Sequence, residues 1–297
     1  QLVKELEPGL NALFGLEYKR YENQHAEIYA TESSDRAFEE EVMLSGFANA
    51  QVKGEGSGVS FDEAQETFTA RYTHETVALA FAITEEAIED NLYDRLASRY
   101  TKALARSMSN AKQVKSVEPL IQGLPTTDNF DSGDGVSLFN TAHPTVAGTF
   151  ANTLATQADL NETSLEQSLI DISSMTDERG LRIAARGVKM IIPSELQFTA
   201  ERLMKSQGRT GTADNDINAI VSMGMVPQGY RVNNYLTDSD AFYILTDIPN
   251  GMKMFNRAPL TTAMEGDFDT GNVRYKARER YSFGVSDPRG IFGVEGA

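Results

Sequence analysis

Side chains that could carry out catalysis are few in this sequence, and none has the spacing that a common reaction needs. The chain contains three histidines and no cysteine, which excludes disulfides, thiolate metal sites and cysteine nucleophiles. The histidines are His25, His74 and His143, and no two of them have metal-ligand spacing. His143 precedes a proline, and we interpret it as a residue packed in a loop.

Two short segments imitate catalytic motifs. Ser109-Asn110-Ala111-Lys112 matches a Ser-x-x-Lys pattern, but the companion motifs of the enzymes that use this pattern are absent. Residues 54–58, Gly-Glu-Gly-Ser-Gly, imitate a phosphate-binding loop. Acidic residues surround them, however, and no helix follows closely enough to receive a phosphate. We therefore predict neither an active site nor a nucleotide site at these positions.

A third segment, Asp131-Ser132-Gly133-Asp134-Gly135, offers carboxylates that could bind a hard cation such as calcium. It lacks the register of an EF-hand and the glutamate that closes one. We interpret it as a turn. The sequence thus predicts a protein that is not an enzyme and that has no metal or cofactor.

The most distinctive charges lie near the C-terminus, where apolar and cationic side chains alternate as in a strand with one buried face. The apolar positions are Val273, Tyr275, Ala277, Tyr281, Phe283 and Val285, and the cationic positions are Arg274, Lys276, Arg278 and Arg280. The simpler interpretation of the cations is an ordinary solvated face. The functional alternative is a basic ladder that docks on an acidic surface of another subunit.

The chain as a whole is acidic. Its 297 residues include 27 basic and 43 acidic ones, a net charge of −16, whereas nucleic-acid-binding domains usually show the reverse balance. Acidic residues predominate over residues 1–66 and basic ones over residues 271–297, which would suit copies that meet head to tail. No apolar stretch is long enough to span a membrane, and we expect no signal peptide.

The elements that would position these charges begin with an acidic arm, residues 1–48, whose scattered apolar residues must pack on another surface. Residues 49–83 are predicted to form a long two-stranded excursion with a glycine-rich tip at 54–58 and a strand at 77–83. A hairpin of this kind is barely stable by itself. We therefore expect it to lie on a partner.

A long helix is predicted next. Residues 84–118 contain neither glycine nor proline, and apolar residues recur at every fourth position. We expect Thr84 to cap this helix and Pro119 to end it. At 1.5 Å per residue it would be roughly 50 Å long, suited to a flat, extended protein.

Strands and helices alternate over residues 123–258, as in an α/β unit. A helix is predicted at 164–178, with Ser164 and Gln167 as its capping box and Leu165, Leu169 and Ile172 on its buried side. Strands are expected at 188–192 and 242–246, and a further helix begins at Pro193.

Three phrases of the sequence resemble segments of the major head subunits of Mu-like and other tailed phages. They are Asp134–Pro144 (DGVSLFNTAHP), Val188–Leu196 (VKMIIPSEL) and Arg280–Gly293 (RYSFGVSDPRGIFG). Their order and spacing make the resemblance specific, and it extends from about residue 45 to the end of the chain.

The resemblance implies the α+β fold of Hong Kong 97-type capsid proteins. It divides the chain into an N-terminal arm (1–48), an extended β-hairpin loop (49–83), the long spine helix of a peripheral domain (84–122), an α/β axial domain (123–258) and the peripheral sheet with the C-terminal strand (259–297). It also implies a major capsid protein that self-assembles, as hexamers and pentamers, into an icosahedral bacteriophage head around double-stranded DNA.

The resemblance further implies a virion protein that is assembled in the cytoplasm of the host bacterium and encloses DNA without binding it specifically. Portal, scaffolding and decoration proteins are further expected partners, and a membrane is not. We expect the cations Arg274, Lys276, Arg278 and Arg280 to meet acidic groups from an adjacent arm or loop, and the candidates for those groups are Glu39, Glu40 and Glu41.

Some proteins with this fold join their subunits covalently through lysine and asparagine. Lys53 is the only lysine in the extended loop, so it is a candidate contact residue. No partner asparagine can be identified, so a cross-link is not assigned.

Two alternative functions remain at the level of sequence. An encapsulin-like nanocompartment has the same fold but encloses an enzyme, so particle size and contents would distinguish it. A soluble acidic α/β enzyme would instead be a monomer with a concave polar pocket.

Overall fold

A computed structural model describes residues 2–89, 93–208, 216–267 and 271–297. The chain divides into two units, each built from three separate stretches. The first unit consists of Gln1–Glu39, Tyr72–Ser116 and Met254–Phe283, and the second of Glu40–Arg71, Val117–Lys253 and Gly284–Ala297. Each core therefore combines segments that lie far apart in the sequence.

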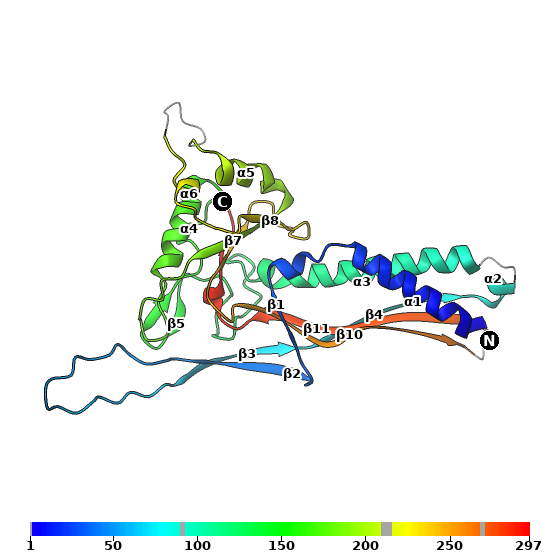
Figure 1. The fold of residues 1–297 in the computed structure, drawn as a ribbon, viewed down its shortest axis with the longest axis horizontal. Helices are drawn as coiled ribbons and strands as arrows, with labels where there is room; N and C mark the ends of the chain where they lie inside the picture. Colours follow the sequence, from blue (N-terminus) through cyan, green and yellow to red (C-terminus); the bar gives the residue numbers. More distant parts are fainter. Residues whose placement is uncertain (1, 90–92, 209–215, 268–270) are drawn as a thin grey trace. The chain divides into compact units, whose positions relative to one another are not determined.

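The first unit is a four-stranded sheet with two helices packed on it (Figure 1). The strand order is β1 (Ala30–Ser33), β10 (Met252–Gly266), β11 (Val273–Val285) and β4 (Glu75–Ile83). The helices are α1 (Leu2–Arg20) and α3 (Tyr93–Gln122), and the short elements η1 (Gln24–Glu27) and α2 (Glu85–Glu89) accompany them.

The core of this unit joins the two helices to the middle of the sheet. Leu10 and Phe14 of α1, Leu104 and Met108 of α3, and Tyr275 of β11 are all buried in one cluster. Because both helices cover the same side of the sheet, only one face of β11 is used for this core.

The long helix begins as predicted, since α2 starts at Glu85 and Thr84 Oγ1 accepts from the backbone nitrogen of Ala87 at 3.4 Å. Residues 90–92, between α2 and α3, lie outside the described part. The C-terminal end differs from the prediction. Proline was expected to end the helix at Pro119, but α3 continues to Gln122. Val117 and Leu120 are almost fully buried. Packing of this last turn outweighs the single hydrogen bond that a proline removes.

The two-stranded excursion is formed by β2 (Phe38–Leu44) and β3 (Glu66–Thr73), with residues 45–65 as the connecting loop. The predicted strand at 77–83 exists as β4, but it pairs antiparallel with β11 rather than serving as an arm of the excursion. Val77, Phe81 and Ile83 pack against the helix–sheet core. This burial explains why β4 joins the larger sheet.

The second unit is built on a mixed sheet with the order β12 (Ile291–Val294), β9 (Phe242–Thr246), β7 (Gly187–Ile192) and β8 (Tyr230–Val232). Strand β8 runs parallel to β7, and the other pairs are antiparallel. The remaining elements are the ribbon β5 (His143–Thr145) and β6 (Gly148–Phe150), helices α4 (Glu162–Ser174), α5 (Gln197–Lys205) and α6 (Ala219–Ser222), and the turns η2 (Ser194–Leu196) and η3 (Pro288–Gly290).

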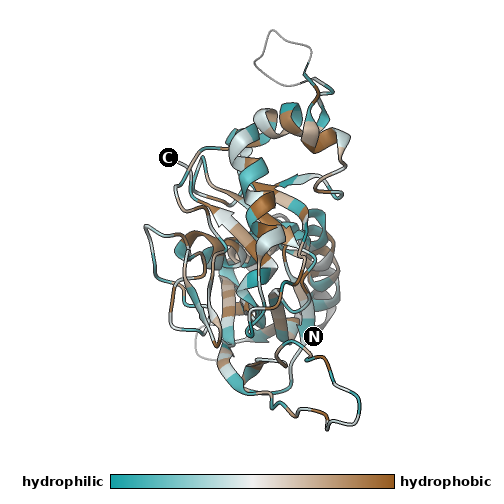
Figure 2. Cartoon of the chain, turned by 90° about the vertical axis from the view of Figure 1, so that its left-hand side faces the viewer, coloured by the Kyte–Doolittle hydropathy of each residue, from teal (hydrophilic) through white to brown (hydrophobic). Residues whose placement is uncertain are grey.

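The predicted strands and helices of this unit are confirmed, and so are the inward residues Leu165, Leu169 and Ile172 of α4. Hydrophobic and hydrophilic residues are both visible along its helices (Figure 2). The cap of α4 was assigned wrongly. Its capping box pairs Asn161 with Ser164, and the helix ends at Ser174. An asparagine one turn earlier caps as well as a serine does.

None of the helices in the described ranges is long and apolar enough to cross a membrane.

Gly187 offers a direct test of the second core, because an added Cβ would lie 2.8 Å from Leu169 Cδ2 and 2.9 Å from Ile244 Cγ2. We expect Gly187→Ala to lower the free energy of unfolding by about 1–3 kcal/mol through overpacking. Gly15→Ala in α1 is the control. Its Cβ would meet nothing within 4 Å, so stability should be unchanged or higher. Chemical denaturation of the purified protein measures both, and equal midpoints would contradict this packing.

Candidate functional site

The cationic residues predicted near the C-terminus lie on one face of β11. Val273, Tyr275, Ala277, Tyr281 and Val285 are buried as predicted, and Phe283 is half-buried. On the opposite face, Arg274, Lys276 and Arg278 are exposed and Arg280 is half-buried. The alternation of side chains along the strand therefore places the four cations on one face, as predicted.

The neighbouring strand leaves this ladder uncovered. On β4, Ala82, Ala80 and Ala78 lie opposite Arg274, Lys276 and Arg278, and Thr76 lies opposite Arg280. Three methyl groups beside three long cations form a shallow surface with charged and apolar parts. Such a surface can accept an extended acidic segment that also carries small apolar side chains.

The four cations differ in what they contact within the chain. Arg274 forms an ion pair with Asp267, and Arg280 Nη2 lies 3.5 Å from the carbonyl oxygen of Ala37. Among the described residues, no ion pair involves Lys276 or Arg278. These two side chains are the ones most available to another molecule.

The three predicted acidic partners already have partners in their own chain. Ser34 Oγ donates to Glu39 Oε1 at 2.6 Å, Arg71 Nε lies 3.9 Å from Glu40 Oε1, and Lys253 Nζ lies 2.5 Å from Glu41 Oε1. Glu40 and its arginine are both well exposed, so their pairing is weak. Glu40 is thus the acid of this group that a neighbour could recruit at least cost.

Lys53 lies in the loop of residues 45–65, where it is exposed. The same loop exposes large apolar side chains: 61% of Phe47, 100% of Val52, 70% of Val59 and 97% of Phe61 are accessible. Apolar residues concentrated on a loop mark a contact surface. No asparagine is identified as a partner for Lys53.

A buried acid on β11 was missed by sequence reasoning. Glu279 lies two residues from both Ala277 and Tyr281, on the same face of the strand, so it points into the helix–sheet core. Lys112 Nζ lies 3.2 Å from Glu279 Oε2, and Tyr18 donates to the same oxygen at 3.4 Å. Burial raises the pKa of Glu279, although Lys112 opposes that shift. The alternation of side chains along the strand was the signal that could have revealed this residue.

This contact also explains the Ser-x-x-Lys segment. Ser109 is buried, and the Lys112 amine is occupied by Glu279 and lies 5.0 Å from the centre of the Tyr281 ring. The lysine therefore ties α3 to β11.

The three histidines are held separately. His74 contacts the hydroxyls of Ser282 and Ser34 at 2.9 and 3.0 Å. His25 lies 3.1 Å from the Gln113 amide, and burial, with help from Lys112, lowers the pKa of His25 to about 4.

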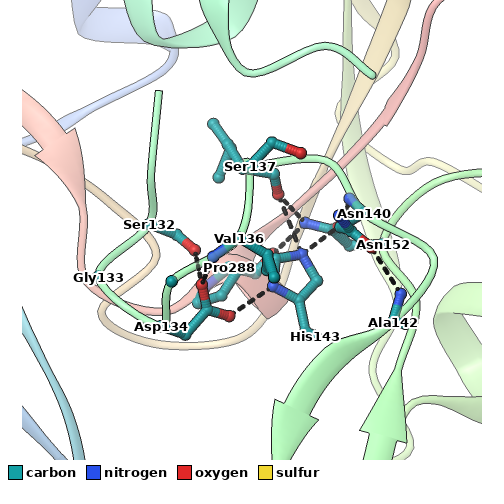
Figure 3. A network of polar contacts seen from close by, with 12 residues as sticks. Ser132, Gly133, Asp134, Val136, Ser137, Asn140, Ala142, His143, Asn152 and Pro288 are labelled. Atoms are coloured by element: carbon teal, nitrogen blue, oxygen red, sulfur yellow. Dashed lines mark hydrogen bonds and ion pairs between the residues drawn. The ribbon is translucent and has the colours of Figure 1, made fainter. Parts of the chain in front are cut away.

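His143 belongs to a sealed polar network in the second unit (Figure 3). Its Nδ1 lies 2.6 Å from Asp134 Oδ2, and its Nε2 lies 2.9 Å from Asn152 Oδ1. Asn152 in turn donates to the carbonyl oxygens of Leu138 and Pro288. His143 and Asn152 are completely buried, so His143 is packed as predicted, but it begins strand β5 rather than lying in a loop.

The network fixes the turn at residues 131–135. Asp131 Oδ1 accepts from the backbone of Gly133 and Gly135, and Asp134 Oδ1 accepts from Ser132 Oγ. The carboxylates of this segment therefore hold a turn, as expected. Across the described ranges, no group of three or more histidine, aspartate or glutamate side chains is arranged to bind a metal.

The turn at residues 131–135 packs against β3, which belongs to the same unit. Gly133 has a φ of +98°, and an added Cβ would lie 2.9 Å from the carbonyl oxygen of Thr69 and 3.1 Å from Ala70 Cα. Only glycine suits both the conformation and the close approach. The buried network thereby fixes the base of the hairpin.

Comparison with known proteins gives the family. A family model described as phage capsid protein matches residues 66–294. No protein among those with curated descriptions matches the sequence significantly.

Solved structures show the fold. A virus-like particle from Pyrococcus furiosus is similar with a TM-score of 0.56 and 10% identity, over 97% of this chain and 98% of that one. The capsid of an empty GTA particle gives 0.54 and 13%, over 92% and 89%. The capsid of Myoviridae phage XM1 gives 0.51 and 13%, over 91% and 89%. The α+β fold of the Hong Kong 97 type is confirmed.

The Asp134–His143 contact should make the free energy of unfolding depend on pH in the acidic range. Burial acts to raise the pKa of Asp134, but hydrogen bonds from His143 and Ser132 outweigh it and lower that pKa. Its contribution is therefore complete above the ordinary aspartate value of about 3.9 and is lost as pH falls through the lower folded value. We expect Asp134→Asn to lower the free energy of unfolding by about 1.5–3 kcal/mol at neutral pH.

Denaturation of the subunit at pH 7 and at pH 3 measures this effect, and the wild-type and variant curves should converge in acid. Asp128→Asn is the matched control because Asp128 is exposed in the same segment. An unchanged stability of Asp134→Asn at pH 7 would contradict the role of the contact.

Proposed function

The chain belongs to the phage capsid protein family, and we propose that copies of it assemble, as hexamers and pentamers, into the icosahedral head shell of a tailed phage. The observation that carries this proposal is the family match over residues 66–294. The fold supports it, because capsid proteins with the same fold align with nearly the whole chain. The role is structural rather than enzymatic.

The resemblance suggests an arm (1–48), an extended loop (49–83), a spine (84–122), an axial domain (123–258) and a peripheral sheet (259–297). We keep these parts but assign the extended loop to the β2–β3 hairpin, residues 38–73, because residues 75–83 form β4 of the four-stranded sheet. The exposed apolar residues of the loop support its role, because they need a surface that would cover them.

The cationic face of β11 is proposed to meet acidic groups of an adjacent arm or loop. Lys276 and Arg278 are its principal residues, because they are exposed and no described acid pairs with them. Single exposed ion pairs contribute only about 0.2–1 kcal/mol. Repetition around a closed shell converts such weak contacts into a stable particle.

The acidity of the chain suits a shell that encloses double-stranded DNA without specific binding. A net charge of −16 does not favour tight contact with phosphates, so the DNA can enter and leave. The protein would then be a virion component assembled in the bacterial cytoplasm, with portal, scaffolding and decoration proteins as further partners.

A nanocompartment shell is the second candidate. The similarity to the virus-like particle from Pyrococcus furiosus, at a TM-score of 0.56, is the observation that favours it. Purified particles distinguish the two functions. DNA inside supports a phage head, and enclosed protein cargo supports a nanocompartment.

Charge reversal tests the cationic face. We expect Lys276→Glu combined with Arg278→Glu to abolish particle formation, because the variant would repel an acidic partner, while the subunit stays folded. Lys102→Glu combined with Arg106→Glu is the control, since it reverses two exposed charges on α3. Sedimentation and negative-stain microscopy measure assembly, and circular dichroism measures folding. Normal particles from the β11 variant would refute the contact.

The loop is tested separately by Phe61→Ser. The side chain is 97% exposed, so the free energy of unfolding of the subunit should change by less than about 0.5 kcal/mol. Burial against a neighbour would make the same substitution costly for assembly, by up to about 3 kcal/mol per contact. A shift of the assembly threshold to higher concentration is the expected result. An unchanged threshold would place Phe61 outside the interface.

A further inference from the structure

One arginine of the second unit holds the loop of residues 45–65. Arg179 Nη2 donates to the carbonyl oxygen of Glu63 at 2.6 Å and lies 3.7 Å from Asp62 Oδ1. Only 17% of its side chain is exposed. The loop thus has a direct polar attachment to its own subunit, just outside the start of β3 at Glu66.

Asp62 extends this attachment across the loop. Its Oδ2 accepts from the backbone nitrogen of Ala48 at 2.7 Å, and this hydrogen bond, assisted by Arg179, lowers the pKa of Asp62. Closer to the strands, Ser45 and Gln65 exchange backbone and side-chain hydrogen bonds. The two sides of the loop are therefore hydrogen-bonded to each other as far as residues 48 and 62. The segment between these two residues is the part of the loop without such a bond.

The arginine stands on a well-fixed turn. Asp177 Oδ1 accepts from the backbone of Arg179 and Leu181 at 2.9 and 2.8 Å. The adjacent Glu178 forms a buried ion pair with Arg289 at 2.6 Å, and Arg289 Nε donates to the carbonyl oxygen of Thr176 at 2.8 Å. The turn is held from both sides, so the position of the guanidinium is determined by the fold of the unit.

The hydrogen bonding of Arg179 is incomplete. Its Nε is buried and has no hydrogen-bond partner among the described residues. A buried donor without a partner is unfavourable, because its hydrogen bond to water is lost and not replaced. The guanidinium therefore bridges to the loop at some cost to the subunit, which fits a role in placing the loop.

We propose that Arg179 is a positioning residue that sets the direction of the extended loop before it docks on another copy of this chain. The inference rests on the proposed function. Fixing the backbone of each residue has a cost in conformational entropy. A loop whose lower part is already ordered leaves less of that cost to the association step, so assembly begins at a lower concentration.

The supports lie at two places on the hairpin. Gly133 packs against β3 at the base, and Arg179 holds residues 62 and 63 further along. Two separated supports fix the direction of a two-stranded ribbon, whereas one would leave it free to pivot.

The test is Arg179→Ala, with Arg182→Ala as the matched control. Arg182 is exposed, and no side-chain contact of it is described. In the unassembled subunit, we expect hydrogen exchange of residues 46–49 and 61–65 to quicken about tenfold in Arg179→Ala, with no change elsewhere. The assembly threshold should rise about tenfold, and Arg182→Ala should match the wild type in both measurements.

Two further results bear on the proposal. Asp62→Asn keeps an oxygen for Ala48 but removes the charge, so it should give a smaller change in the same direction. The proposal would be overturned if hydrogen exchange in the loop of Arg179→Ala stayed at the wild-type rate. It would also be overturned if exchange became faster while the assembly threshold stayed the same or fell.

The exchange measurement separates this proposal from the proposed function, because it needs no particles. If wild-type subunits formed no shell at any concentration, the proposed function would fail and the docking role of Arg179 with it. If wild-type shells formed and Arg179→Ala assembled equally well, only the role of Arg179 would fail.

Discussion

A β-strand sends successive side chains to opposite faces of its sheet, and this constraint on β11 determines much of the protein. Helices α1 and α3 both pack on one face, so Tyr275 and Ala277 enter the core. The cations between them must then point away. The same alternation carries Glu279 inward, where Lys112 offsets part of the cost of burying its charge. The exposed ladder and the buried ion pair thus have a single cause.

The hairpin presents the opposite situation, because little of it is buried. A two-stranded ribbon has too little core to be stable by itself, and its loop carries Val52 and Phe61 fully or almost fully exposed. Within its unit it is supported by Gly133 and Arg179 instead. Its remaining apolar surface suits a second copy.

Glu39, Glu40 and Glu41 differ in how costly it is to exchange their partner within the chain for one on a neighbouring subunit. Glu41 is close to Lys253, which is itself largely buried, and separating them would leave a charge poorly solvated. Glu40 and Arg71 lie further apart and are well exposed, so water can replace their contact. Sequence alone marked these glutamates as equivalent. Their unequal burial, a tertiary property, distinguishes them.

Periodicity in the sequence was sufficient to predict strands β4, β7, β9 and β11, the inward side of α4 and the cationic face, because these depend on local geometry. The phrases resembling phage head subunits identified the family and the fold. Local pattern could not predict that β4 pairs with β11, that α3 passes through Pro119, or that Arg179 reaches Glu63. Those features depend on which distant segments pack together, and the energy of such packing exceeds local preferences of about 1 kcal/mol.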